Sequence, residues 1–369
     1  MKNGIRLSAL GGVVLASALA LSACGSDDNG GTTAAPAGGD ANCVKATVNA
    51  AGSSAQKNAV EAWTNGYSAT CDGAVLNYNP AGSGAGIQAF TQKQAAFAGS
   101  DSALKPEEVD PAKARCGGNT PLNLPMVVGP VGVVYNVKGV SDLQLSPKTL
   151  ALIFTGKVKT WNAPEIAAEN KGATLPSTAI KPVYRSDESG TTDNFTKYLG
   201  VTAKDQWSYE HAKVWPSAIA GAGQGAAKSD GVSTVVKQTD GSISYVELSY
   251  VTNNQLSAVK VQNGNGEYVA VSPEAASKTI EGAAVKGTGN DLALDIDYAT
   301  KTPGAYPIVL VTYEIACEKG LEGDQAKFVK SFLTYTASDA GQAELVKIGY
   351  APIPASLITK VRASVAALS

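Results

Sequence analysis

The chain has 369 residues, of which 44% are hydrophobic and 17% are charged, and its formal net charge is −2. This length accommodates two domains with separate cores. The sequence contains no run of basic residues, which argues against a nucleic-acid partner. After the first apolar stretch, no segment reaches the roughly 20 apolar residues that a membrane-spanning helix needs.

The N-terminus has the pattern of an export signal. Basic residues at positions 2 and 6 precede an uncharged apolar stretch from Leu7 to about Ala20, which is short for a spanning helix. The stretch ends in the sequence LSAC, which resembles the lipobox of bacterial lipoproteins, where the cysteine thiol receives a diacylglycerol. We therefore predict a signal peptide at residues 1–23 and a lipid anchor at Cys24, on the outer face of the cytoplasmic membrane. The alternative is an ordinary secretory signal with a chance cysteine.

Residues 24–42 contain almost only small and polar side chains. Such a segment cannot bury enough apolar surface to order itself, so we expect a flexible tether. Removal of residues 1–23 takes away two basic residues and no acidic one, which changes the formal charge from −2 to −4.

From residue 44 onward, short apolar strands alternate with helices. The first predicted strands lie at 44–49, 74–78 and 96–98, with helices at 53–68 and 86–94 between them. The later elements are an apolar crossing segment at 125–136, a helix at 146–154 capped by Ser146, a strand at 180–184, a helix at 191–199, a strand at 242–246 followed by 247–253, a strand at 308–315, and helices at 325–336 and 339–348. This alternation is typical of an α/β fold with a parallel sheet.

The late strand and the C-terminal helices must join or pack on a sheet. In the simplest arrangement this is the sheet of the first domain. We therefore predict a discontinuous domain I, residues 43–127 and 305–369, around a domain II of residues 128–304. Two crossings would join these domains, as in a binding protein that closes on a ligand in the interdomain cleft.

Four cysteines follow Cys24, namely Cys43, Cys71, Cys116 and Cys317. They form no C-x-x-C pair, and His211 is the single histidine, so a zinc or redox site is not expected. An even number in an exported chain predicts two disulfides. Because Cys43 and Cys71 each directly precede a predicted strand, they could meet at one sheet edge, which leaves Cys116 for Cys317. Two other pairings remain possible.

Four segments place small or hydroxylic residues directly after a predicted strand: Ala51–Ala55, Ala81–Gly86, Gly99–Asp101 and Arg185–Thr192. A helix start exposes unpaired N–H groups and a partial positive charge, and glycines let the backbone approach an anion. Each segment alone is more simply explained as a helix cap, and the glycines of the second lack the G-x-G-x-x-G spacing of a dinucleotide loop. Their joint occurrence predicts an oxyanion site at the strand ends.

Together these four segments resemble those of the phosphate-binding lipoproteins of high-affinity ABC phosphate importers, the PstS family. The similarity covers nearly the whole mature chain and includes IFTGKVKTWN at 153–162, GSISYVE at 241–247 and GYAPIP at 349–354. It implies a two-domain periplasmic-binding-protein fold of type II that closes on one dehydrated phosphate. It also implies a monomer without cofactor or metal, not an enzyme, which delivers inorganic phosphate to the permease and ATPase subunits of an importer.

The resemblance also implies the ligand contacts, carried over position by position. They are Ser54, the N–H of Ala55, Ser83, Asp101, Arg185, Ser189, the N–H of Gly190, and Thr191. Some relatives have threonine and an aromatic residue where this chain has Ser54 and Ala55. A hydroxyl is nevertheless retained at Ser54, and the contact from Ala55 needs only the backbone.

Arg185 is the one strong cation of the four segments, and its guanidinium is able to bind two phosphate oxygens. Asp187 is expected to orient Arg185 from behind, the alternative being a cap of the following helix. Asp101 is the most informative residue, since a carboxylate repels most anions. Phosphate at neutral pH keeps a proton to donate and sulfate does not, so we expect Asp101 to select phosphate over sulfate.

Three other functions remain open from the residues alone. An exported phosphatase would use Ser189 or Ser54 as nucleophile, but that chemistry usually needs a metal cluster or a histidine base, and His211 stands alone and reads as a surface residue. A binding protein for sulfate or molybdate is disfavoured by Asp101, whose carboxylate would repel such an anion. A surface adhesin would leave the four hydroxyl- and glycine-rich turns without a role.

Overall fold

The computed structural model describes residues 43–369, so the predicted signal peptide, the Cys24 anchor and the tether lie outside the described residues. Within this range, none of the helices has the length and apolar character required to cross a membrane. Strands and helices alternate as the sequence predicted, with boundaries displaced by a few residues.

The secondary structure falls into three runs along the chain. The first is β1 (Thr47–Gly52), α1 (Lys57–Thr70), β2 (Val75–Asn79), α2 (Ser83–Thr91), β3 (Ala98–Ser100) and α3 (Pro106–Arg115). The second is β4 (Pro121–Asn136), β5 (Gln144–Leu145), α4 (Pro147–Phe154), α5 (Pro164–Glu169), β6 (Lys181–Arg185), α6 (Gly190–Thr202), the 3-10 helix η1 (Ser217–Ala222), β7 (Gln224–Ala226), α7 (Lys228–Gln238), β8 (Ser242–Glu247) and α8 (Leu248–Asn254). The third is β9 (Ser257–Ala258), β10 (Lys260–Gln262), β11 (Tyr268–Val269), α9 (Pro273–Glu281), β12 (Ala284–Val285), β13 (Leu294–Asp295), β14 (Val309–Cys317), α10 (Gly323–Thr336), α11 (Asp339–Lys347) and α12 (Ala355–Ala366).

Helices α3, α5, α7, α9 and α12 were not predicted from the sequence. Pro111 lies inside α3 and obscures its pattern, since proline normally ends a helix. Helix α12 begins after Pro354 without a capping side chain, so it lacks the usual start signal. The predicted cap at Ser146 is present, with its hydroxyl accepting the N–H of Thr149 at 3.2 Å.

The central sheet has the strand order β2-β1-β3-β14-β4-β8-β6-β7, with β9 also paired to β4. Strands β2, β1 and β3 are parallel to one another, and so are β8, β6 and β7. In the middle, β14 and β4 run antiparallel to their neighbours. The prediction of a parallel sheet is therefore correct at both ends and wrong at the centre.

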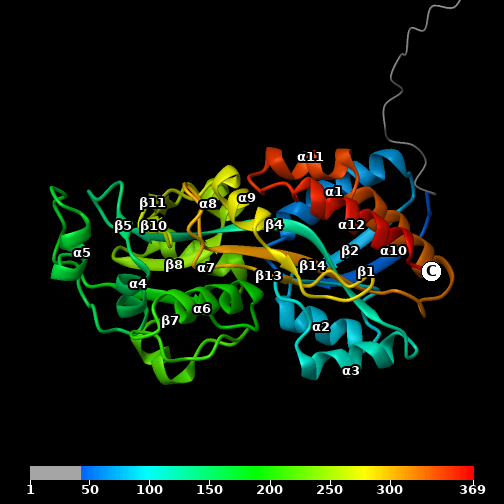
Figure 1. The fold of residues 1–369 in the computed structure, drawn as a ribbon, viewed down its shortest axis with the longest axis horizontal. Helices are drawn as coiled ribbons and strands as arrows, with labels where there is room; N and C mark the ends of the chain where they lie inside the picture. The colour runs from blue at the N-terminus through cyan, green and yellow to red at the C-terminus, as the bar shows by residue number, and fades with distance from the viewer. Residues whose placement is uncertain (1–42) are drawn as a thin grey trace, which may run out of the picture. The chain divides into compact units, whose positions relative to one another are not determined.

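Strand β4 explains the antiparallel centre. Its residues from Pro121 to Pro130 pair with β14, and those from Val131 to Asn136 pair with β8. Fifteen of its sixteen residues are buried, which accounts for the continuous apolar run that the sequence placed at a domain crossing. Figure 1 shows β4 and β14 running side by side between the two groups of parallel strands. The long strands themselves link the two groups, without the helical crossover that parallel neighbours require.

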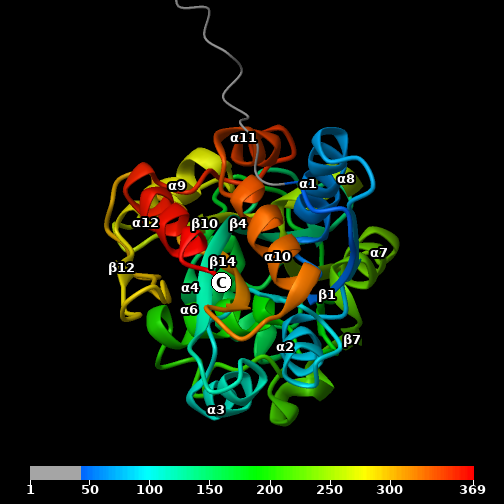
Figure 2. The ribbon, with the colours of Figure 1, turned by 90° about the vertical axis from the view of Figure 1, so that its right-hand side faces the viewer.

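The C-terminal helices pack against the N-terminal part of the described chain. Helices α10 and α11 contact α1, and α12 packs on α10, as both ribbon views show (Figures 1 and 2). Trp63 of α1 is fully buried there and donates from Nε1 to the carbonyl of Gly341 at 2.8 Å.

Two disulfides join the segments that the sequence paired. Cys43 is bonded to Cys71, with 5.2 Å between their Cα atoms, and Cys116 to Cys317, with 5.3 Å. The first bond lies before β1 and β2, which are parallel neighbours in the sheet. The second ties the end of α3 to the last residue of β14 across 201 positions of sequence.

Candidate oxyanion-binding site

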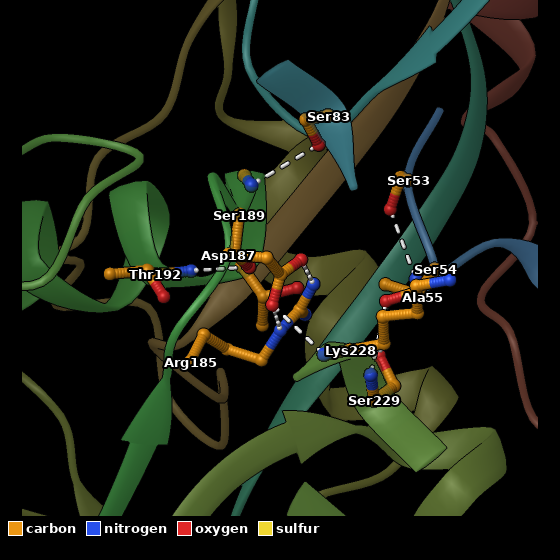
Figure 3. A network of polar contacts seen from close by, with 12 residues as sticks. Ser53, Ser54, Ala55, Ser83, Arg185, Asp187, Ser189, Thr192, Lys228 and Ser229 are labelled. Atoms are coloured by element: carbon orange, nitrogen blue, oxygen red, sulfur yellow. Dashed lines mark hydrogen bonds and ion pairs between the residues drawn. The ribbon is translucent and has the colours of Figure 1, made fainter. Parts of the chain in front are cut away.

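All four hydroxyl- and glycine-rich segments follow the carboxyl ends of strands. They begin at the last residues of β1, β3 and β6 and just after β2, and three of them lead into helices α1, α2 and α6. The parallel strands of each group end on the same side, which is where open α/β sheets bind ligands. Figure 3 shows polar contacts of the first, second and fourth of these segments and of the start of α7.

Ser83 joins the turn after β3 to the start of α6. Its hydroxyl oxygen accepts the N–H of Gly190 at 3.1 Å and the N–H of Asp101 at 3.2 Å. A Cβ atom at Gly190 would lie 2.6 Å from both Ser83 Oγ and Asp101 Cβ. The glycine is therefore required by the close approach of three segments that are far apart in sequence.

Asp101 is 2% exposed and is held at both carboxylate oxygens. Oδ1 accepts the hydroxyl of Thr312 at 2.9 Å, and Oδ2 accepts the hydroxyl of Thr191 at 3.2 Å. Burial raises the pKa of Asp101, although the hydrogen bonds from Ser53 and Thr312 and the charge of Arg185 act in the opposite direction. The predicted selectivity residue is thus a fixed hydrogen-bond acceptor.

Arg185 ends β6 and is 3% exposed. Its Nε donates to Asp187 Oδ1 at 2.8 Å and its Nη2 to Oδ2 at 2.5 Å, so the two side chains form a bidentate ion pair (Figure 3). Oδ1 also accepts the N–H of Lys228 at 2.8 Å. Burial alone would raise the pKa of Asp187, but the hydrogen bonds and charge of Arg185 outweigh it and hold that pKa below its ordinary value.

Ser54 and Ala55 lie in the turn between β1 and α1. Ser54 Oγ is 3.0 Å from Ser229 Oγ and accepts the Ser229 N–H at 3.1 Å. The Ala55 N–H donates to Ser53 Oγ at 3.0 Å. Their carbonyls accept hydroxyls from two buried tyrosines, Ser54 from Tyr250 and Ala55 from Tyr350, each at 2.7 Å. Both peptide planes are therefore fixed from outside the turn.

The start of α6 supplies the remaining predicted contacts. Ser189 is the N-cap, and its hydroxyl accepts the N–H of Thr192 at 3.2 Å, so this cap is not Asp187. Gly190 and Thr191 form the first turn, where the Gly190 N–H donates to Ser83 Oγ and the helix dipole favours an anion.

The structure thus places the eight predicted residues in the strand-to-helix turns. Direct contacts join Ser83 to Gly190 and Asp101, and Asp101 to Thr191. Ser54 contacts the start of α7 directly, whereas Arg185 does so through Asp187.

The sequence did not identify several residues that contact these turns. Lys228 and Ser229 begin α7, directly after the short strand β7, and repeat the strand-to-helix pattern of the other turns. Gly223 and Gly225, which precede them, indicate a turn, but strand β7 has only three residues and was too short to recognise. Thr312 is distant in sequence, and nothing local pointed to it.

The expectation that His211 stands alone is wrong. Its Nδ1 lies 2.8 Å from Oδ1 of Asp193, a carboxylate that also accepts the hydroxyl of Ser102 at 2.6 Å. The imidazole side chain is 46% exposed, so it does lie at the surface. Asp193 sits in α6, and spacing along the chain gave no reason to pair the two.

The chemistry of the site is that of recognition. It gathers one arginine, several hydroxyls, backbone N–H groups at helix starts, and two carboxylates, of which Asp187 is paired with Arg185 and Asp101 is held by two threonine hydroxyls. This set suits a tetrahedral oxyanion that carries a proton. In the range 43–369, no three histidine, cysteine or acidic side chains are grouped to hold a metal ion.

Comparisons with known proteins give the family. A model of the PBP superfamily domain matches residues 32–340. The chain is 44% identical to Phosphate-binding protein PstS3 of Mycobacterium bovis, over 99% of each chain, and 40% identical to Phosphate-binding protein PstS 2 of Mycobacterium tuberculosis, over 97% of each.

Solved structures share the fold. A high-affinity periplasmic phosphate-binding protein, PfluDING, solved with phosphate bound, superposes with a TM-score of 0.72 at 22% identity, over 86% of this chain and 93% of that one. Phosphate binding protein from Stenotrophomonas maltophilia gives a TM-score of 0.66 at 20% identity over the same shares. These likenesses confirm a type II periplasmic-binding-protein fold. By its sequence relatives, the chain belongs to the PstS family of phosphate-binding proteins, within the PBP superfamily.

Proposed function

We propose that this protein captures inorganic phosphate outside the cytoplasm and delivers it to an ABC importer. The family consists of extracytoplasmic substrate-binding proteins of transport, not of enzymes. The observation that carries the proposal is the fixed, buried carboxylate of Asp101, which, unlike Asp187, is paired with no cation of the described chain. Such an acceptor suits an anion that still has a proton, as phosphate has at neutral pH.

The ligand contacts in this proposal are Ser54, the Ala55 N–H, Ser83, Asp101, Arg185, Ser189, the Gly190 N–H and Thr191. Arg185 supplies the positive charge, and Asp187 orients its guanidinium while balancing part of that charge. The start of α6, with Thr191 in its first turn, adds backbone donors, and Ser54 adds a hydroxyl that Ser229 polarises by donating its N–H to it. Asp101 accepts a hydrogen bond from the protonated oxygen of the phosphate.

Capture takes place by closure of two domains, residues 43–127 with 305–369 and residues 128–304. The contacts between Ser83 and Gly190 and between Ser54 and Ser229 support this division, because each joins a residue of one proposed domain to a residue of the other. Binding in such a cleft removes the anion from water, so the donors must replace its hydration.

Delivery requires the protein to stay near the membrane. We propose that Cys24 carries a lipid anchor, that residues 24–42 form the tether, and that the protein acts as a monomer with the permease and ATPase subunits of the importer. The sequence LSAC at the end of the apolar N-terminal stretch supports the anchor.

Equilibrium dialysis of the purified protein with radiolabelled phosphate tests the proposed ligand. Arsenate should compete, because it is tetrahedral and keeps a proton at neutral pH, whereas sulfate should not. Competition by sulfate at the strength of phosphate would instead favour a binding protein for tetrahedral anions in general.

A further inference from the structure

A largely shielded ion pair outside the anion site joins two segments that are far apart in sequence. Lys213 lies between α6 and η1, and its Nζ is 2.5 Å from Oε1 of Glu108 in the first turn of α3. The Lys213 side chain is 6% exposed and that of Glu108 is 20% exposed. Ion pairs this well shielded from water are uncommon, since long charged side chains are normally solvated.

Each partner is also attached directly to a segment of the anion site. The main-chain carbonyl of Lys213 accepts the N–H of Ser189, the cap of α6, at 2.8 Å. On the other side, Glu108 Oε2 accepts the N–H of Lys105 at 2.8 Å, which fixes the start of α3 four residues after Asp101. The pair thus connects the turn that contains Ser189 with the turn that contains Asp101.

We propose that the Glu108–Lys213 ion pair is a closing contact between the two domains, and that it slows the release of bound phosphate. The proposal rests on the proposed function, in which Glu108 belongs to domain I and Lys213 to domain II. Opening the cleft would separate the two charges and let water reach both.

Loss of one partner of the ion pair should destabilise the closed form of the protein more than the open form. A lone Lys213 or Glu108 in the closed protein would be a shielded charge without its counter-ion, whereas in the open protein water would hydrate it. Truncating one member of a buried, hydrogen-bonded charge pair changes mainly the dissociation rate. Association, which depends on Arg185 and the donors of the site, should change little.

The chain provides a matched control in Lys57 and Asp230. This pair joins α1 to α7 across the same proposed boundary, at 3.4 Å, but its side chains are 33% and 60% exposed. Exposed pairs contribute little, because water screens them and their side chains lose entropy. If burial is what makes the Glu108–Lys213 pair effective, the control pair should not affect release.

The test is the release of radiolabelled phosphate from the purified protein after a chase with unlabelled phosphate. Lys213→Met should raise the dissociation rate by at least about tenfold and leave the association rate within about threefold. Glu108→Gln keeps an oxygen for the Lys105 N–H and should also speed release. The double variant should release phosphate more slowly than Lys213→Met alone, because no charge remains unpaired. Lys57→Met should match the parent within about twofold.

The outcomes separate the two proposals. A parent protein that binds no phosphate would overturn the proposed function and the role of the ion pair with it. Normal binding by the parent with unchanged release from both Lys213→Met and Glu108→Gln would overturn the ion-pair proposal alone. An equal acceleration by Lys57→Met would also overturn it, since any ion pair across the boundary would then act alike.

Discussion

The hydroxyl of Thr312 donates to Oδ1 of Asp101 over 2.9 Å. Thr312 lies on β14 and Asp101 follows β3, its neighbour in the sheet, so the central strands hold this carboxylate in place. Asp101 therefore cannot turn away from an anion that enters the site. It must either accept a hydrogen bond from that anion or repel it, which makes the selectivity of the site testable at one residue.

Replacing Asp101 by asparagine should reduce the discrimination between phosphate and sulfate. The amide keeps the size of the side chain, removes the negative charge and offers a donor, so sulfate should gain affinity and phosphate should lose some. We expect the ratio of the two dissociation constants to shrink by at least about tenfold, since a buried unpaired charge costs on the order of kilocalories. Calorimetric titration with both anions measures this ratio. An unchanged ratio would refute the role of Asp101 as the filter.

Arg185→Ala should abolish most of the phosphate affinity while the fold remains intact. It removes the only arginine of the site and leaves Asp187 as a partly buried carboxylate without its partner. Loss of one partner of a buried charge pair predicts at least about a hundredfold weaker binding. Arg362→Ala is the matched control, since that arginine forms a pair with Asp339 at the surface, with 43% and 85% of the two side chains exposed. Equal phosphate affinity of the Arg185 variant and the parent would show that the site is misplaced.

Two buried glutamates should make the protein less stable as the pH rises. Burial raises the pKa of Glu247 and of Glu314 from 4.5 to about 8. Between these values the unfolded chain has released the proton and the folded chain still holds it, so the free energy of unfolding falls with increasing pH. Each carboxyl contributes a slope on the order of 1 kcal/mol per pH unit in this window.

Urea unfolding of the variants Glu247→Gln and Glu314→Gln at several pH values checks this dependence. Each variant should flatten the decline, because an amide does not titrate. Glu165→Gln, at an exposed position, should leave the slope unchanged. A parent protein whose stability rises from about pH 5 to about pH 8 would contradict the assignment of neutral, buried carboxyls.

The two disulfides should differ in their contribution to stability. The bond from Cys116 to Cys317 spans 201 positions of sequence and that from Cys43 to Cys71 spans 28, and loop-closure entropy in the unfolded chain grows with span. Serine replacements of Cys116 and Cys317 should lower the free energy of unfolding by about 2 kcal/mol more than those of Cys43 and Cys71. Equilibrium unfolding in urea measures the difference. A larger loss for the Cys43–Cys71 pair would show that local strain or residual structure outweighs chain entropy.

Cys24→Ser should release the protein from the membrane. Without the thiol no diacylglycerol can be attached at this position. Metabolic labelling with palmitate and separation of membrane from medium follow the effect. Continued labelling and membrane association of the variant would contradict the anchor.

Local patterns predicted much of the fold and of the site. Strand-to-helix turns carry their signal within a few residues, which is why the turns that contain Ser54, Ser83 and Arg185 could be predicted from the sequence. Contacts between distant segments had no such signal. The antiparallel centre depends on how β4 and β14 meet, and the pairing of Asp193 with His211 depends on how the loop after α6 returns. Ser229 was missed because β7 is short and its helix was not recognised.

The most direct test of the account is a crystal structure of the protein grown with phosphate. We predict one phosphate among the strand-to-helix turns, bound by Arg185 and the start of α6, with one oxygen within hydrogen-bond distance of Asp101. Phosphate bound elsewhere, or an occupied site in which Asp101 turns away from the anion, would contradict it.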